Sequence, residues 1–178
     1  KLFEELLLEY GLVQFGRFAD ENGEFVPFKL NLDWMVSYPD VLNAAAFDVQ
    51  DHFRFHNKTI YQFERILCSV EALPVATLVS ASTGIPLVYS RGQGEPAVLD
   101  LIGAYDINHP TLMLTTMDSV SQGWQLQADA HRVGLHVIYS LTLVEDFVPL
   151  ENTPREYGRS GSIIDIITLS QLAANSAY

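Results

Sequence analysis

The chain has 178 residues, of which 48% are hydrophobic and 18% charged, a composition that excludes a disordered polymer and fits one globular domain over residues 1–178. Its 22 acidic and 10 basic residues give a formal net charge of -12, which argues against nucleic acid and anionic membrane surfaces as partners. Cys68 is the single cysteine, so no internal disulfide can form, and no apolar run approaches a membrane span; both features fit a cytoplasmic protein. The sequence starts at Lys1 without a signal-peptide pattern or an initiator Met, so the native N-terminus can lie upstream.

The first third of the chain predicts a helix, a hairpin and a second helix. Apolar side chains recur at helical spacing over residues 2–13. Two aromatic-rich runs, 13–18 and 24–32, flank a turn-forming stretch, which predicts an antiparallel β-hairpin. The second helix opens around Pro39, because proline suits the first turn of a helix.

From residue 64 onward, short apolar runs alternate with helical segments. The predicted strands are 65–70, 86–89, 111–115, 136–144 and 163–168, and the predicted helices are 74–82, 122–133 and 169–177. This alternation is typical of βαβ units and predicts a central, mostly parallel sheet flanked by helices. The fold class is therefore α/β, with a helix and a hairpin added at the N-terminal side.

Several stretches, in order along nearly the whole chain, resemble orotate phosphoribosyltransferase, a type I phosphoribosyltransferase. They are residues 15–18, 22–23, 27–28 and 31 in the hairpin, then 37–39, 73–77 (LPVAT), 83–91 (TGIPLVYSR), 133–137, 143–146 and 164–172. The resemblance implies the type I fold, a homodimer, and transfer of a phosphoribosyl group from phosphoribosyl pyrophosphate to orotate with Mg²⁺.

The chemistry of that family needs three features. Backbone amides at a helix N-terminus hold the 5′-phosphate, because that end offers free N–H groups and a positive dipole. Two adjacent carboxylates before this loop bind the ribose hydroxyls and steady the developing positive charge of the transition state. A mobile loop rich in Lys and His closes over the pyrophosphate.

The acidic pair is missing from this sequence. The corresponding run is 112–124 (LMLTTMDSVSQGW), and counting back from Gly134 puts Thr115 or Thr116 where the carboxylates belong. A threonine hydroxyl cannot replace an anion beside a developing cation or a Mg²⁺ ion. Asp118 lies nearby but alone, and too late in the turn.

The charged residues of the mobile loop and the base-binding region are also replaced. After Arg91, residues 92–100 (GQGEPAVLD) form a shorter stretch with no Lys or His. The hairpin position that usually supplies a Lys is close to Glu21, and the Asp-Arg pair whose Arg contacts orotate reads as Glu145 and Asp146. We therefore predict a degenerate site with no confidently assigned catalytic residue and no cofactor, and Mg²⁺ only if activity remains.

A remnant of the anion site supplies the candidate ligand-binding residues, for a phosphorylated small molecule. They are Arg91, Thr115, Thr116, Asp118, Ser119, Ser121, Gln122 and Gly123. Each of these residues can instead have an ordinary structural role, and for three of them we favour that role over ligand binding. Arg91 can be a solvated or acid-paired arginine at a strand end, Ser121 an N-cap, and Asp118 a turn or cap residue.

Three further patterns have a structural interpretation that we favour over a site. His52 and His56 have the i, i+4 spacing of a metal pair but no third ligand, so we expect a packed or solvated helix face. Cys68 is expected to be a small buried residue. Residues 158–162 (GRSGS) are expected to form a flexible turn, because no helix follows them as a phosphate loop requires.

Three functions remain open from the sequence. The favoured one is a catalytically impaired phosphoribosyltransferase homologue that acts as a phosphate- or nucleotide-binding, regulatory or structural subunit. The second is an active phosphoribosyltransferase of nucleotide metabolism with a diverged ligand set, using orotate or another base. The third is a structural interaction module that uses the aromatic N-terminal hairpin as its contact surface.

Overall fold

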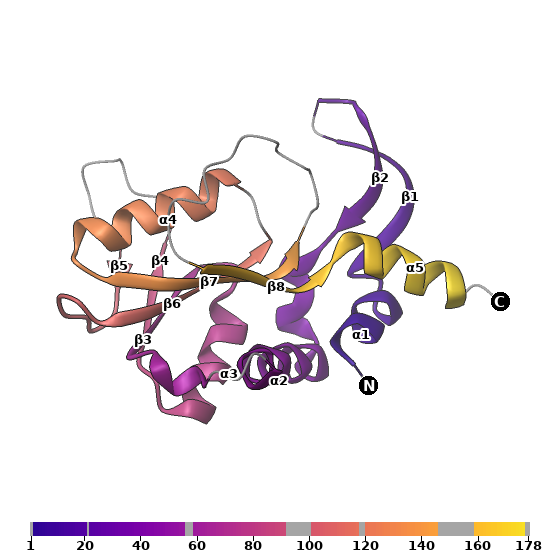
Figure 1. Cartoon of the computed structure of the whole chain (residues 1–178). Coiled ribbons are helices and arrows are strands. Elements are labelled where there is room, and N and C mark those ends of the chain that lie inside the picture. Colours follow the sequence, from indigo (N-terminus) through magenta and orange to yellow (C-terminus); the bar gives the residue numbers. More distant parts are fainter. Residues whose placement is uncertain are drawn as a thin grey trace.

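The computed structural model (Figure 1) describes residues 2–20, 22–55, 59–91, 101–117, 120–145 and 159–176. Its elements in chain order are α1 (Phe3–Glu9), β1 (Val13–Ala19), β2 (Phe25–Leu30), the 3₁₀ helix η1 (Leu32–Ser37), α2 (Pro39–Phe55), the 3₁₀ helix η2 (Ile60–Gln62), β3 (Arg65–Ser69), α3 (Leu73–Thr83), β4 (Leu87–Ser90), β5 (Leu101–Ile102), β6 (Pro110–Met117), α4 (Val120–Arg132), β7 (His136–Glu145), β8 (Arg159–Asp165) and α5 (Ile166–Ser176). No described helix is long and apolar enough to cross a bilayer.

A six-stranded sheet in the order β5-β4-β3-β6-β7-β8 forms the centre of the fold. Neighbouring strands are parallel except β5, which runs antiparallel to β4. The chain passes from β3 to β4 on one side and then crosses to β6 on the other side of β3. In open α/β sheets, ligands commonly bind outside the carboxyl ends of the strands at such a switch point. The predicted mostly parallel α/β sheet is confirmed.

Helices cover both faces of this sheet, with α4 on one face and α2 and α3 on the other (Figure 1). The core follows the two-residue alternation of the strands. Ile66 and Cys68 belong to the larger core beneath the N-terminal helices, whereas Leu67 packs with Met113 and Leu126 on the α4 face. Cys68 is fully buried, as its place in an apolar strand predicts.

Local sequence signals explain where several elements begin and end. Pro39 is the first residue of α2, where its missing N–H costs nothing. Gly84 ends α3 with a left-handed φ of 75°, and its N–H donates to the carbonyl of Ser80 at 2.8 Å. Asp165 precedes α5, and its Oδ1 accepts a hydrogen bond from the backbone N–H of Thr168 at 2.7 Å.

The N-terminal predictions need two corrections of boundary. The first helix ends at Glu9 rather than at residue 13, because Gly11 has a left-handed φ of 66° and leads into β1. The second hairpin strand ends at Leu30, since the following residues form η1. The antiparallel hairpin itself is confirmed by the pairing of β1 with β2.

The last strand and the last helix begin earlier in the chain than predicted. The strand expected at 163–168 is β8, which begins at Arg159, and α5 begins at Ile166 instead of residue 169. The flexible turn expected at 158–162 is therefore wrong for residues 159–162, which pair with β7 as a sheet strand; Gly158 lies outside the described residues. The two-residue strand β5 was not predicted.

Candidate functional site

The carboxyl edge of the sheet is where the parallel strands β3, β4, β6, β7 and β8 end. Arg91 directly follows β4 there and is exposed, whereas the neighbouring Ser90 is buried. Of the other predicted site residues, Thr115, Thr116 and Gly123 lie in described segments together with the backbone of Ser121 and Gln122. Asp118 and Ser119 lie outside the described residues, as do Glu21, Asp146 and the stretch 92–100.

Thr115 is a strand residue whose hydroxyl is already engaged. Its Oγ1 lies 2.9 Å from Oγ1 of Thr142, the residue directly opposite it on β7, and either hydroxyl can donate. Both threonines are only 6% exposed. Because Thr115 follows Met113 by two residues, it lies on the α4 face of the sheet. The hydroxyl pair therefore satisfies two buried polar groups within the sheet.

The end of β6 lies further along the chain than predicted. The strand expected to stop at residue 115 continues to Met117, which still pairs with Val144. Thr116 is therefore also inside the strand; it is half-buried and, by alternation, on the face opposite Thr115. The two residues at the expected carboxylate position thus point to opposite faces of the sheet.

The start of α4 follows β6 closely. The helix begins at Val120, so Ser121 is a residue of its first turn, and the predicted N-cap role of Ser121 is wrong because an N-cap precedes the first helical residue. Gly123 is half-buried in the same turn, and a Cβ added to it would meet nothing within 4 Å. The first turn of a helix has N–H groups without partners inside the helix, and such a turn is a common place for an anion.

Two carboxylates lie at the ends of β7 and β8, and both have structural partners. Glu145 and Asp165 are paired in register. Oε2 of Glu145 accepts a hydrogen bond from Oγ of Ser162 at 2.8 Å. The two carboxylate oxygens of Asp165 accept from the backbone N–H and the hydroxyl of Thr168, at 2.7 and 3.0 Å. This side of the edge consequently carries negative charge, opposite in sign to Arg91 beside β4.

His52 joins α2 to the sheet. Its Nε2 lies 2.9 Å from the hydroxyl of Tyr139 on β7, and its ring packs edge-on against Phe53 and Tyr139. The expectation of a packed face is confirmed for His52, and His56 lies outside the described residues. Gly161 of β8 lies beside the pair and is the one sequence signal of this close approach.

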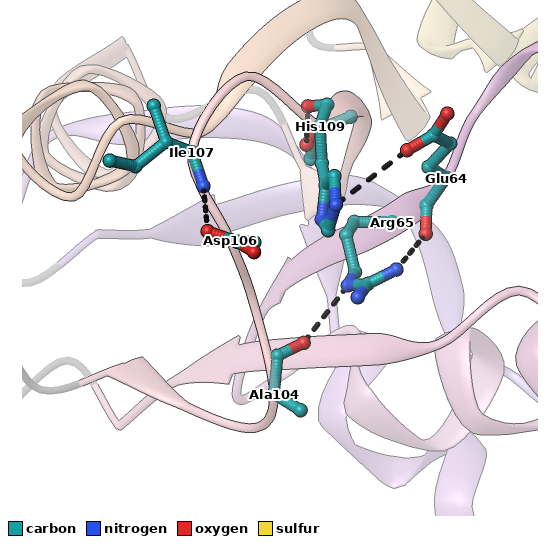
Figure 2. Close-up of polar contacts among 7 residues, drawn as sticks. Glu64, Arg65, Ala104, Asp106, Ile107 and His109 are labelled. Atoms are coloured by element: carbon teal, nitrogen blue, oxygen red, sulfur yellow. Dashed lines mark hydrogen bonds and ion pairs between the residues drawn. The ribbon is translucent and has the colours of Figure 1, made fainter.

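A second polar cluster lies at the opposite, amino edge of the sheet (Figure 2). Arg65, the first residue of β3, donates from Nε to the carbonyl of Ala104 at 2.9 Å and from Nη1 to the carbonyl of Glu64 at 2.6 Å. Nε2 of His109 is 3.7 Å from Oε2 of Glu64. These contacts tie the β5–β6 connection to the start of β3, far from the ends where a ligand would bind. Across the described residues, no group of three His, Cys, Asp or Glu could hold a metal ion.

No protein-family model matches the sequence. Among solved structures, the chain superposes on Leishmania donovani UMP synthase with a TM-score of 0.81 at 22% identity, covering 98% of this chain and 38% of that protein. Orotate phosphoribosyltransferase from Aeropyrum pernix gives 0.77 at 15% identity, covering 97% of this chain and 99% of that one. The Mycobacterium tuberculosis H37Rv enzyme in complex with 5-phospho-alpha-D-ribosyl 1-diphosphate gives 0.70 at 15% identity, covering 94% and 96%. The chain therefore has the type I phosphoribosyltransferase fold and spans about two fifths of the UMP synthase.

Proposed function

We propose that this chain is an orotate phosphoribosyltransferase-like protein that binds a phosphorylated small molecule at the carboxyl edge of its sheet and is impaired in phosphoribosyl transfer. It would act as a phosphate- or nucleotide-binding, regulatory or structural subunit. The fold supports the place of the ligand, because the strand order changes direction between β3 and β6 and ligands of open α/β sheets commonly bind at the carboxyl edge of such a switch point.

The observation that carries the impairment is the buried pair of Thr115 and Thr142. Where the resemblance expects a carboxylate, the structure has a neutral hydroxyl held by another hydroxyl at 2.9 Å. Losing one group that stabilises the charge of a transition state costs roughly 10²–10³ in rate. In the sequence, Asp146 stands where the resemblance expects the arginine that contacts the base. The two changes act in the same direction, against binding and turnover of anionic substrates.

Ligand-dependent thermal unfolding tests the proposal. Inorganic phosphate and orotidine monophosphate should raise the melting temperature of the full chain. At a ligand concentration a hundredfold above the dissociation constant, binding should add about 2–3 kcal/mol to the free energy of unfolding. Incubation with orotate, phosphoribosyl pyrophosphate and Mg²⁺ should form no orotidine monophosphate. The control variant is Arg132→Ala, because Arg132 is an exposed arginine of α4 whose guanidinium lies 3.5 Å from the carboxylate of Asp129. Product formation that is lost in Arg91→Ala and kept in Arg132→Ala would contradict the impairment.

The alternative is an active phosphoribosyltransferase that transfers the group to orotate or another base with Mg²⁺ and a diverged ligand set. It is supported by the extent of the structural match, 97% of this chain against 99% of the Aeropyrum pernix enzyme. A screen of nucleobases with phosphoribosyl pyrophosphate, read out by release of pyrophosphate, separates it from the first proposal. Release with any base would favour this alternative.

The N-terminal hairpin supports the third function, a protein contact. Phe25 is 64% exposed near the hairpin turn, and the guanidinium carbon of Arg17 lies 3.8 Å above its ring.

We also propose that residues 1–178 form a single domain that assembles as a homodimer. Light scattering after size-exclusion chromatography tests the assembly, with Phe25→Ser as the variant that should weaken a hairpin-mediated contact. A monomer for the unaltered chain would contradict the dimer.

A further inference from the structure

The solvent face of the N-terminal hairpin combines positive charge with an aromatic ring. Strand β2 alternates regularly, because Phe25, Pro27 and Lys29 are exposed and the residues between them are half-buried. Phe25 is 64% exposed, and the guanidinium carbon of Arg17 lies 3.8 Å above its ring. Lys29 shares this face with Phe25, since residues an even number of positions apart in a strand point to the same side. Arg17, Phe25 and Lys29 therefore form one exposed surface, here called the hairpin face.

The positive charges of the hairpin face are not neutralised within the chain. Neither Arg17 nor Lys29 forms an ion pair with any residue that the structure describes. The acids Asp20 and Glu24 lie at the hairpin turn, and Oδ1 of Asp20 accepts hydrogen bonds from the backbone N–H groups of Asn22 and Glu24 at 2.9 and 2.8 Å. In a chain with a net charge of -12, such a face is complementary to an acidic partner surface.

Helices α1 and α2 carry a surface of the opposite charge, here called the acidic seam: Glu4 of α1 with Asp48 and Asp51 of α2. Desolvation, and then the charges of Glu4 and Asp51, raise the pKa of the Asp48 carboxyl to about 6. Oδ1 of Asp51 is 3.8 Å from Arg54, but neither Glu4 nor Asp48 has an ion-pair partner in the described segments. Phe47 is 59% exposed and lies one helical turn before Asp51 on the same face of α2. The acidic seam thus also has an exposed aromatic ring beside it.

The placement of the two surfaces allows each to meet a second molecule. The hairpin projects away from α1 and α2 (Figure 1). A strand of seven residues such as β1 spans roughly 20 Å, so the hairpin extends well beyond its base. Two copies of a chain with a net charge of -12 repel each other, and a contact between them is favoured where a positive face meets an acidic one. Hairpin-to-hairpin contact would instead bring like charges together.

We therefore propose that the chain forms a twofold homodimer in which the hairpin face of each copy docks on the acidic seam and Phe47 of the other copy. This proposal rests on the homodimer proposed above and specifies its interface. The contact forms twice in a closed dimer, because a twofold interface is reciprocal. In each contact Phe25 packs against Phe47, and the two cations relieve the repulsion between Glu4 and Asp48.

Charge reversal in the full chain, followed by sedimentation equilibrium, tests this interface. Lys29→Glu and Glu4→Lys should each raise the dissociation constant of the dimer at least about tenfold, because each places like charges across both contacts. Both changes in one chain restore opposite charges, and the dissociation constant should return to within about threefold of that of the unaltered chain. Phe47→Ser should weaken the dimer without any change of charge.

The control is Arg132→Glu on α4, which lies on the other face of the sheet from α2 and changes the net charge by the same amount as Lys29→Glu (Figure 1). It should change the dissociation constant less than about threefold. Circular dichroism shows that each variant is folded.

The possible failures can be told apart. Glu4→Lys lowers the net negative charge, so general repulsion between copies predicts a tighter dimer, whereas docking on the acidic seam predicts a weaker one. A dimer that Glu4→Lys tightens or leaves unchanged overturns this interface and leaves the homodimer intact. The same holds if Lys29→Glu weakens the dimer no more than Arg132→Glu does. If the unaltered chain is a monomer, the proposed homodimer falls, and this interface falls with it.

Discussion

The hydroxyl of Tyr139 lies 2.9 Å from Nε2 of His52 and joins strand β7 to helix α2. Gly161 of the edge strand β8 passes directly beside this pair. A Cβ at position 161 would lie 2.5 Å from the Tyr139 hydroxyl oxygen and 3.0 Å from Nε2 of His52. The contact therefore joins β7 to α2, and a side chain at position 161 of β8 would have to displace one of its two groups.

Gly161→Ala should lower the free energy of unfolding, by roughly 1–3 kcal/mol, because an added methyl group must displace a partly buried hydrogen-bonded pair. Tyr139→Phe in the same chain should recover part of that loss, since it removes the oxygen nearest the new Cβ. Urea unfolding followed by circular dichroism measures both. The matched control is Gly123→Ala, whose Cβ meets nothing within 4 Å and which should be neutral or stabilising in α4. Equal stability of Gly161→Ala and the unaltered chain would contradict the close approach.

Thr115 and Thr142 should be strongly coupled in stability. Replacing either one with valine leaves the other buried hydroxyl without its partner, 2.9 Å away, which costs about 1–3 kcal/mol. The double replacement removes both hydroxyls at nearly constant volume and should cost less than the sum of the two single ones. A double-mutant cycle from urea unfolding gives the coupling energy. Additive losses would mean that the two hydroxyls do not interact.

Asp48 on α2 should make stability depend on pH. Desolvation, and then the nearby charges of Glu4 and Asp51, raise the pKa of its carboxyl from 3.8 to about 6. The folded state therefore binds more protons than the unfolded state between these two values. Stability contributed by protonated Asp48 is present at low pH and is lost as the pH rises through about 6.

Asp48→Asn removes a partly buried charge and should raise the melting temperature at pH 8 while changing it little at pH 4. Since Asp48 is partly exposed, solvent screening reduces the gain. Differential scanning calorimetry across this range measures the difference. Asp33→Asn, which removes a charge from an exposed residue of η1, is the control for the change in net charge. A gain for Asp48→Asn that is equal at both pH values would argue against the raised pKa.

The start of α5 should depend on the carboxylate of Asp165. Asp165→Ala removes the acceptor of two hydrogen bonds from Thr168, at 2.7 and 3.0 Å, and should cost about 1 kcal/mol of stability. Asp165→Asn keeps a side-chain oxygen at the N-cap and should cost less. Hydrogen exchange of the amides of the first turn of α5 measures the local effect. An unchanged exchange rate at Thr168 in the alanine variant would rule out the cap.

The order of strands and helices could be predicted because its signals are local. The apolar run at 112–114 predicts a strand, and this strand is part of β6. The glycine at position 84 predicts the end of a helix, and α3 ends there. Strand β5 could not be predicted in this way. Its two residues are a strand only because Leu101 pairs with Ser90 and Ile102 with Tyr89, a contact that depends on where β4 lies.

The candidate site was less accessible to sequence reasoning. The sequence placed Thr115 or Thr116 at the expected carboxylate position, which depends only on counting residues. It gave no indication that Thr142, 27 residues later, would hold the hydroxyl of Thr115. Nor did it reveal that residues 159–162 form a strand, because glycine and serine there indicate a turn until the neighbouring strand β7 supplies hydrogen-bond partners.

The sequence by itself determined the α/β class, the burial of Cys68 and the presence of threonines at positions 115 and 116, because composition, periodicity and residue identity are properties of the chain alone. Only the tertiary structure decided which polar groups meet. The pairs Thr115–Thr142 and His52–Tyr139 join residues 27 and 87 positions apart. Their contact depends on strand register and on the packing of α2 against the sheet, and a hydrogen bond of about 3 Å tolerates little error in either.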